Sequence, residues 1–435
     1  MKFSVITFGC RANKCDAEWI SAAIRDKGHE QAVRLQEADI VIVNACTVTA
    51  EAARQARQAI RRARKQNPHA IIVAAGCAVQ AEPARFLSMP ELDYTADMAA
   101  RSHLAGMIEG LLPGNAPQPL HAPENRYDPF FCPHDEAPFE QGRARAVLKI
   151  QDGCPNNCTY CIVTKVRGDS RSMPTVEIID HLKRLKKLGH GEVVLTGISL
   201  ASWGQDLLPS RSLGDLLKVI GRTKKMPRIR LSSIDPAEIS TGLMNMLAAD
   251  NGICPHLHIP IQSGDDEILK AMGRRYTARE AGVRIRLLRQ AIPDMAIGLD
   301  VIVGFPGETD EHFKQTLETF DNLPFDYLHV FPFSPRPGTV ASTLPDKVPH
   351  ALARERGRQL REMGSRRRNN FWRGQLGTMR NTIIESPARG GKGFRCRTDN
   401  YIPVVIGPGN WTVGEILPVR LVSVGERMLK GEVAL

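Results

Sequence analysis

The chain has 435 residues, of which 42% are hydrophobic, and it carries a formal net charge of +11 at pH 7. A chain of this length is expected to form roughly two or three domains rather than one. No run of about 18 apolar residues occurs, which argues against a transmembrane helix, and the N-terminus lacks a signal-peptide layout, so we expect a cytoplasmic protein. The positive charge favours a nucleic-acid partner, because neutralising phosphates gives sequence-independent affinity.

The first 112 residues alternate short apolar runs with helical stretches. Residues 3–8, 40–43 and 71–75 have the apolar pattern of strands. Residues 50–66 are rich in Ala, Gln and Arg, which favours a helix. Alternation of strand, helix and strand is typical of a parallel sheet covered on both faces. We therefore predict a doubly wound α/β domain over residues 1–112.

Three cysteines of this region, Cys10, Cys46 and Cys77, each follow the end of a predicted strand. Open parallel sheets bind ligands at that carboxyl edge, so three separate loops could bring three thiols together. The alternative is three unrelated buried cysteines, since free cysteine often behaves as a small hydrophobe. Their shared position at strand ends favours a common metal site. No role is predicted for Cys15, Cys132, Cys254 or Cys396.

The predicted helix over residues 50–66 carries Arg54, Arg57, Arg61 and Arg64 at intervals of three and four residues, and therefore on one face. Such a run of charge usually marks a solvated helix face. Because this helix begins beside a candidate cluster loop, contact with phosphates is an equally good interpretation. We expect Arg54, Arg57 and Arg61 to bind RNA.

Residues 113–141 are rich in Pro, His and acidic residues without periodicity, which predicts a linker. Strand–helix alternation then resumes over a predicted core of residues 142–370. Six such units are too few for an eightfold barrel and favour a partial one, whose ligand site would lie at the C-terminal ends of the strands. The expected strands span residues 146–150, 192–195, 228–231, 257–260, 296–303 and 327–331, with helices between them such as 175–188 and 277–291.

The first strand of this core leads into a loop that contains Cys154, Cys158 and Cys161. The C-x3-C-x2-C spacing lets one loop bring three sulfurs to one face of an iron–sulfur cluster. A [4Fe–4S] cluster that only stores electrons takes four thiolates, whereas three leave one iron open to a substrate or cofactor. A zinc knuckle is the alternative, but structural zinc uses four closed ligands, and no fourth Cys or His lies nearby. The spacing therefore predicts an open iron–sulfur cluster at the mouth of the barrel.

Small and polar residues follow several strands of the same core. Glycine permits close approach of the backbone to a ligand, and hydroxyl and amide groups bond ribose or amino-acid groups. Taken singly, each such residue more often only forms a turn, but together they predict one ligand pocket at the mouth of the barrel. The cofactor contacts that we expect are Tyr160, Thr196, Gly197, Ser232, Ser233, Gln262 and Gly304.

The C-terminal region begins after a very basic helix that contains Arg366 and Arg367. Residues 371–435 form short alternating runs separated by Gly and Pro, which favours a small antiparallel β-barrel of OB-like size, a frequent nucleic-acid platform. Arg395 and Arg397 lie in this region, although β surfaces often carry such residues without binding anything. We predict RNA contacts for these four arginines.

The C-x3-C-x2-C loop with Tyr160 before its last cysteine resembles the radical S-adenosylmethionine (SAM) superfamily. Over nearly the whole chain the resemblance is closer, because a three-cysteine N-terminal domain, a radical SAM core and a barrel similar to a TRAM domain are the arrangement of methylthiotransferases. The matching segments are Val43-Asn-Ala-Cys-Thr-Val-Thr49, Lys149-Ile-Gln-Asp-Gly-Cys154, His258-Ile-Pro-Ile-Gln-Ser-Gly264 and Asp300-Val-Ile-Val-Gly-Phe-Pro-Gly-Glu308.

Within this family, Thr47-Val48-Thr49 resembles the branch that acts on threonylcarbamoyl-adenosine in tRNA. The isopentenyl-adenosine branch usually has Ser-Val-Arg there, and the ribosomal-protein branch has Gly-Phe-Ile. Ala45 and Trp203 stand where Thr and Tyr are usual, and neither departure removes a cluster ligand.

The resemblance implies SAM and two [4Fe–4S] clusters as cofactors. A radical derived from SAM would remove the hydrogen from C2 of N6-threonylcarbamoyladenosine at position 37 of tRNA, and the product would be the 2-methylthio nucleoside. The implied partners are the anticodon loop of tRNA, an external one-electron donor and a sulfur source. The implied ligands are Cys154, Cys158 and Cys161 for the radical SAM cluster and Cys10, Cys46 and Cys77 for an auxiliary cluster that delivers sulfur.

Two other hypotheses come from different classes. One is a methylthiotransferase that acts on isopentenyl-adenosine or on a ribosomal protein. The other is a non-catalytic iron–sulfur protein that binds RNA.

Overall fold

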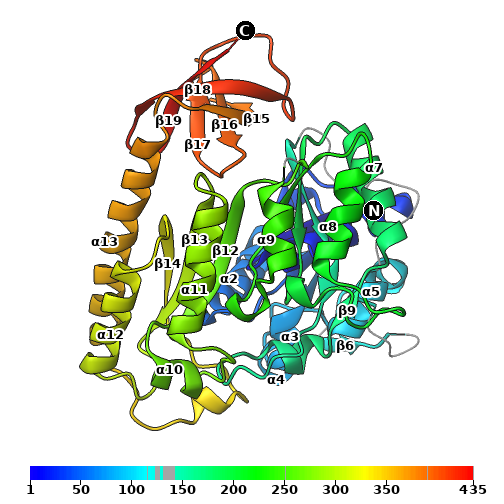
Figure 1. Ribbon diagram of the computed structural model, residues 1–435. Coiled ribbons are helices and arrows are strands. Elements are labelled where there is room, and N and C mark those ends of the chain that lie inside the picture. The colour runs from blue at the N-terminus through cyan, green and yellow to red at the C-terminus, as the bar shows by residue number, and fades with distance from the viewer. Residues whose placement is uncertain (115, 123–127, 131–142, 250, 389, 435) are drawn as a thin grey trace. The chain divides into compact units, whose positions relative to one another are not determined.

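The computed structural model describes the whole chain except residues 115, 123–127, 131–142, 250, 389 and 435 (Figure 1). Cys132 and parts of the predicted linker lie outside the described residues. The chain forms two compact units that alternate along the sequence. The first unit comprises Met1–Glu140, Lys149–Arg171 and Ser334–Ser342, and the second comprises Gln141–Leu148, Ser172–Phe333 and Thr343–Leu435. Both cysteine triads therefore belong to the first unit, and the predicted domain boundaries stay a prediction.

The N-terminal region is a six-stranded sheet in the order β2-β1-β3-β4-β5-β6, with every pair of neighbours parallel. This order begins like that of flavodoxin-type doubly wound sheets, and it confirms the predicted fold class. Its elements are β1 (Lys2–Thr7), α1 (Arg11–Asp26), β2 (Glu30–Gln31), β3 (Ile40–Asn44), α2 (Ala50–Gln66), β4 (Ile71–Ala75), α3 (Cys77–Ala81), α4 (Pro83–Leu87), β5 (Tyr94–Ala96), α5 (Met98–Met107) and β6 (Gln118–Leu120).

Strand β3 shows why this sheet is covered on both faces. All five of its residues are buried, and successive side chains point to opposite faces. Val41 and Val43 pack in a core with the alanine-rich face of α2. Ile40 and Ile42 pack in a second core with residues of α1 and α5. A continuous apolar strand is thus required, because neither face meets water.

Six strands of the central region form two three-stranded sheets, ordered β11-β10-β7 and β12-β13-β14, and β8 pairs with β9 in a separate two-stranded sheet. A bridge between Ser233 and His258 links the two sheets, which confirms the predicted partial barrel. The elements are β7 (Arg145–Lys149), β8 (Gln151–Asp152), α6 (Val163–Arg167), β9 (Arg171–Ser172), α7 (Thr175–Lys187), β10 (Glu192–Thr196), α8 (Leu213–Arg222), β11 (Arg228–Leu231), α9 (Thr241–Ala248), β12 (His256–Gln262), α10 (Asp266–Ala271), α11 (Ala278–Ala291), β13 (Ala296–Val303), α12 (Asp310–Asp321) and β14 (Tyr327–Pro332).

The C-terminal region is a long helix, α13, followed by a closed five-stranded barrel ordered β15-β16-β17-β19-β18. The predicted barrel is confirmed, with one difference in pairing: β17 and β19 are parallel, whereas the other four pairs are antiparallel. The elements are α13 (His350–Gly374), β15 (Met379–Pro387), β16 (Phe394–Thr398), β17 (Pro403–Ile406), β18 (Ile416–Val424) and β19 (Leu429–Val433).

Glu192, at the start of β10, holds this barrel against the central strands. The buried carboxylate accepts hydrogen bonds from the Nε atoms of Arg228 and Arg230, each at 2.7 Å. The same two guanidinium groups donate to backbone carbonyls of the barrel, at Asn381 and Asp399. Burial alone would raise the pKa of Glu192, but the arginines hold it well below its usual range.

Candidate functional site

Cys10, Cys46 and Cys77 lie just past the carboxyl ends of three adjacent strands, β1, β3 and β4. Cys10 precedes α1, Cys46 follows β3, and Cys77 opens α3. The structure brings them together: Cys46 donates a hydrogen bond to Cys10, which lowers the pKa of Cys10 to about 6, and Cys77 interacts electrostatically with Cys46. A Cβ at Gly9 would lie 2.2 Å from the Cys46 sulfur, so only glycine permits this approach.

The surroundings of Cys46 suit a bound metal cluster or another group that accepts hydrogen bonds. The Val48 amide lies 3.4 Å from the Cys46 sulfur and donates to it. The hydroxyl of Thr47, a side chain with 2% exposure, has no hydrogen-bond partner among the described residues. Buried hydroxyls are normally satisfied. Three convergent thiols beside this unsatisfied hydroxyl fit an iron–sulfur cluster with one open iron.

The second triad lies on the loop between β8 and α6. The Cys154 amide donates a hydrogen bond to the Gly168 carbonyl at 3.1 Å, which closes the base of this loop. Gly153 makes this closure possible, because its φ is +73° and a Cβ there would lie 1.9 Å from the Asp169 carbonyl oxygen. The Asn156 amide donates to the Cys154 sulfur at 3.4 Å. The three thiols are half-buried, which leaves them accessible to a bound cluster.

A buried ionic network joins the two cysteine loops within the first unit. Its members are two carboxylates and three cations, all with 2% exposure or less: Asp16, Asp152, Arg101, Lys149 and Arg167. Arg167 is its centre, because its guanidinium donates to Asp16 at 2.9 Å, to Asp152 at 2.7 Å and to the sulfur of Cys77 at 3.2 Å.

The other two cations of the buried ionic network converge on the same acids. Arg101 donates to Asp16 at 2.7 Å, and Lys149 donates to both Asp16 and Asp152. Burial alone would raise the pKa of Asp16, but the cations lower it to about 2. Because Lys149 and Asp152 lie just before Cys154 while Asp16 lies on α1, the network ties the C-x3-C-x2-C loop to the N-terminal sheet.

Sequence reasoning missed this network. The signal that could have found it is the pair of charged residues, Lys149 and Asp152, that interrupts an apolar strand just before the cysteines.

Residues 334–342 return to the first unit and contact both cysteine loops, which the sequence also did not indicate. The Ala50 amide, at the start of α2, donates to Ser334 Oγ at 3.0 Å. The Ala341 amide donates to the Thr159 carbonyl, within the C-x3-C-x2-C loop, at 2.8 Å. Between them lies Arg336, a side chain with 4% exposure whose charge acts on Cys46. A buried cation near a thiolate helps to offset the negative charge of a thiolate-bound cluster.

Six of the expected cofactor contacts lie together at the carboxyl ends of β10 to β13 in the second unit: Thr196, Gly197, Ser232, Ser233, Gln262 and Gly304. Tyr160 belongs to the first unit. Ser232 has 4% exposure, and its Oγ has no hydrogen-bond partner among the described residues. An orphaned hydroxyl at the ligand edge of a barrel fits a polar cofactor such as SAM. Gln262 and Gly304 have φ values of +69° and +74°, so the backbone turns sharply at this edge.

The arginines expected on α2 differ in their surroundings. Arg54 is exposed and paired with Glu51 at 2.6 Å, and Arg61 is paired with Glu91 at 3.5 Å. Arg57 is half-buried, which lowers its pKa. Arg64, on the same face, is bound to Asp93 and to carbonyl groups. Exposed ion pairs are weak, so Arg54 and Arg61 are accessible to phosphate, and RNA contact stays a prediction.

The arginines expected near the C-terminus also divide into two kinds. Arg366 and Arg395 are exposed, and neither has an acidic partner within 4 Å among the residues described. Arg367 is half-buried over the Phe325 ring, at 5.3 Å, and Arg397 is paired with Glu385 at 2.9 Å. The first pair is therefore better placed for RNA than the second.

Ala45 and Trp203, the two residues that differ from the pattern of the resembled family, are both packed in the interior. Ala45 is fully buried, and its amide donates to the Ala75 carbonyl at 2.7 Å. Trp203 is also fully buried, and its indole N–H donates to the Met173 carbonyl at 2.9 Å. In the part of the chain that the structure describes, no helix is both long and apolar enough to span a membrane.

Comparisons with known proteins agree with this geometry. Residues 148–320 match the radical SAM superfamily, and residues 2–96 match the uncharacterized protein family UPF0004. The threonylcarbamoyladenosine tRNA methylthiotransferase MtaB of Rickettsia prowazekii is 35% identical over 99% of this chain and 97% of its own. The tRNA-2-methylthio-N(6)-dimethylallyladenosine synthase of Desulfotalea psychrophila is 31% identical over 99% and 98%.

Among solved structures, the radical SAM methyltransferase TsrM of Kitasatospora setae has a similar fold. The TM-score is 0.58, with 16% sequence identity, over 78% of this chain and 77% of that one. The similarity to curated methylthiotransferases extends from the first cysteine triad through the terminal barrel. The chain therefore belongs to the family of radical SAM tRNA methylthiotransferases, of the MtaB type.

Proposed function

We propose that this enzyme attaches a methylthio group to C2 of N6-threonylcarbamoyladenosine at position 37 of tRNA. The observation that carries the proposal is the full-length similarity to MtaB proteins, together with two cysteine triads in one compact unit. The branch that acts on isopentenyl-adenosine is the second candidate, because relatives of that name are 31% identical.

In this proposal Cys154, Cys158 and Cys161 hold one [4Fe–4S] cluster, and Cys10, Cys46 and Cys77 hold the other. When bound, the clusters and SAM supply the one-electron chemistry and the sulfur that an aromatic C–H carbon requires, since that carbon offers no acidic proton to a base. Gly153 allows the first loop to close, and Arg167 donates a hydrogen bond to one ligand of the second triad.

The remaining residues orient the cofactor and the substrate. Ser232, with its unsatisfied hydroxyl, lies where a polar group of SAM would bind. Exposed arginines such as Arg54, Arg366 and Arg395 would contact tRNA phosphates, which position the RNA without reading its sequence. The modified base must leave its stack to react, which costs little in a single-stranded loop. An external electron donor and a sulfur source complete the reaction.

The test is anaerobic reconstitution with reductant, SAM and tRNA, followed by mass spectrometry of the digested nucleosides. Two tRNA substrates are compared, one with threonylcarbamoyl-adenosine and one with isopentenyl-adenosine. We expect a methylthio adduct only on the first. An adduct only on the second would favour the other branch, and no adduct on either, with both clusters intact, would refute the proposed activity.

Cys154→Ala and Cys46→Ala separate the roles of the two triads. Cys154→Ala should abolish formation of 5′-deoxyadenosine. Cys46→Ala should preserve that cleavage and lose sulfur transfer. Sulfur transfer by Cys46→Ala at the wild-type rate would contradict the role assigned to the N-terminal triad.

A further inference from the structure

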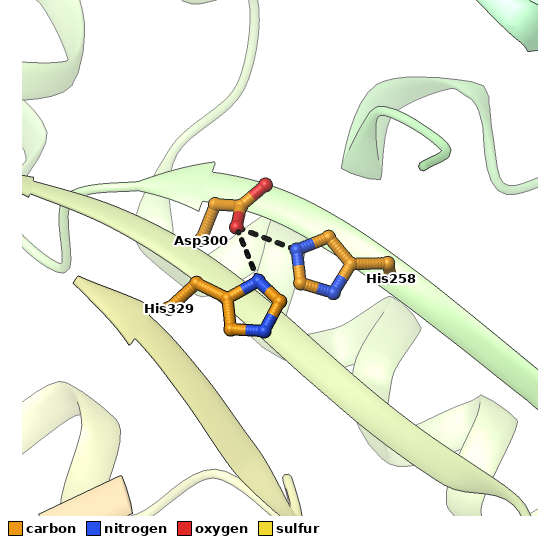
Figure 2. A group of neighbouring side chains, drawn as sticks. All are labelled: His258, Asp300 and His329. Carbon is orange, nitrogen blue, oxygen red and sulfur yellow. Dashed lines mark ion pairs between the residues drawn. The ribbon is translucent and has the colours of Figure 1, made fainter. Parts of the chain in front are cut away.

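Two histidines and an aspartate face one another on adjacent strands of the second unit (Figure 2). His258 lies on β12, Asp300 on β13 and His329 on β14. Asp300 and His329 are paired in register, and His258 is paired with Gly298, two residues before Asp300. Side chains two residues apart on a strand share a face, so all three project from the same side of the sheet.

The three side chains converge on a single oxygen. His258 Nε2 lies 2.5 Å from Asp300 Oδ1, and His329 Nδ1 lies 3.4 Å from the same atom. The three potential ligand atoms all lie within 4.8 Å of one another. Asp300 Oδ1 is buried, and its close contacts among the described residues are with these two imidazoles. Three potential ligand atoms from three side chains this close together could bind one metal ion.

The surroundings of the aspartate suit a cation. The carboxylate of Asp300 lies beside two imidazoles, and its side chain is only 20% exposed. A partly buried carboxylate is normally matched by a positive charge or a metal ion.

A second layer of residues orients His258. Its Nδ1 lies 3.4 Å from the Tyr327 hydroxyl, which in turn lies 2.7 Å from His256 Nε2. Gly298 makes room for this tyrosine, because a Cβ there would lie 2.1 Å from the Tyr327 ring. In metal sites a ligating histidine almost always bonds a polar group through its other ring nitrogen, which directs the first nitrogen at the metal.

We propose that His258, Asp300 and His329 bind a divalent transition-metal ion of the Zn²⁺, Mn²⁺ or Fe²⁺ class, separate from the two iron–sulfur clusters. Two imidazole nitrogens and one carboxylate oxygen are a ligand set that these ions take. Three protein ligands leave coordination positions for water or an oxygen ligand. The His329 side chain is 56% exposed, which gives the ion a route to the site from solvent.

The proposal is tested on the full-length, anaerobically reconstituted protein after removal of loosely bound metal with a chelator. Mn²⁺ is titrated in, and the free ion is measured by room-temperature EPR; zinc uptake is measured separately by mass spectrometry. We expect the wild type to bind one ion more per chain than His329→Ala and Asp300→Asn. Tyr327→Phe, which removes only the orienting hydroxyl, should weaken binding by about 10- to 100-fold.

The matched control is His69→Ala, which removes an exposed histidine of the first unit. It should bind as the wild type does, and circular dichroism and the visible absorbance of the iron–sulfur clusters should be unchanged in all variants. Because these measurements need no tRNA and no turnover, they are independent of the proposed enzymatic activity. Equal uptake of both metals by the wild type and His329→Ala would overturn the proposal and leave a hydrogen-bonded His–Asp–His triad.

Discussion

Replacing Asp16 by asparagine should destabilise the first unit, because this carboxylate neutralises three buried cations of the ionic network. Its pKa of about 2, against a usual value of 3.8, corresponds to about 2.5 kcal/mol of stability at neutral pH. Breaking a buried ion pair by removing one partner typically costs about 3–5 kcal/mol. We therefore expect Asp16→Asn to lower the free energy of unfolding by about 2–5 kcal/mol.

The assay is urea unfolding followed by tryptophan fluorescence, to which the fully buried Trp19 of the same unit contributes. With an m-value of about 3 kcal/mol/M, the midpoint should fall by about 1 M. The matched control is Glu37→Gln, an exposed acid of the same unit, which should stay within about 0.5 kcal/mol of the wild type.

The pH dependence gives a second check on Asp16. A carboxyl with a lowered folded-state pKa stabilises the protein above its unfolded-state pKa, and this stability is lost as pH falls through the folded-state value. The difference between wild type and Asp16→Asn should therefore be complete above about pH 4 and shrink toward pH 2. A variant as stable as the wild type at pH 7 would refute the account of the network.

Two further predictions concern the cysteine loops. Gly153→Ala should reduce the iron content, because the added Cβ would lie 1.9 Å from a carbonyl oxygen. The control is Gly189→Ala, since Gly189 also has a positive φ but a Cβ there would meet nothing within 4 Å. Equal iron contents of the two variants would contradict the prediction. Arg167→Gln should lower the reduction potential of the cluster proposed on Cys77. The N–H···S bond and the positive charge of Arg167 favour the reduced, more negative state, and the substitution removes both. A difference of about 1 kcal/mol corresponds to about 40 mV in an EPR-monitored redox titration, and an unchanged potential would exclude this role.

The amino-acid sequence by itself determined the architecture and the six cysteines proposed as ligands. Apolar runs such as residues 40–43 and 71–75 have the pattern of strands buried on both faces, so the strands, their helix cover and the strand-end positions of Cys10, Cys46 and Cys77 follow from local patterns. The order of the strands in the sheet depends on long-range packing. The C-x3-C-x2-C loop is equally local, because all three ligands lie within eight consecutive residues.

Only the tertiary structure decided how distant charges are matched. Asp16 and Lys149 are separated by 133 positions, and Arg167 and Cys77 by 90. Spacing in the sequence contains no information about pairs this far apart, because their proximity arises from how whole elements pack. The same holds for His258, Asp300 and His329, which meet only because β12, β13 and β14 are neighbours in register. Local residue patterns thus predict strands and cysteine loops, whereas the partners of buried charges depend on long-range packing.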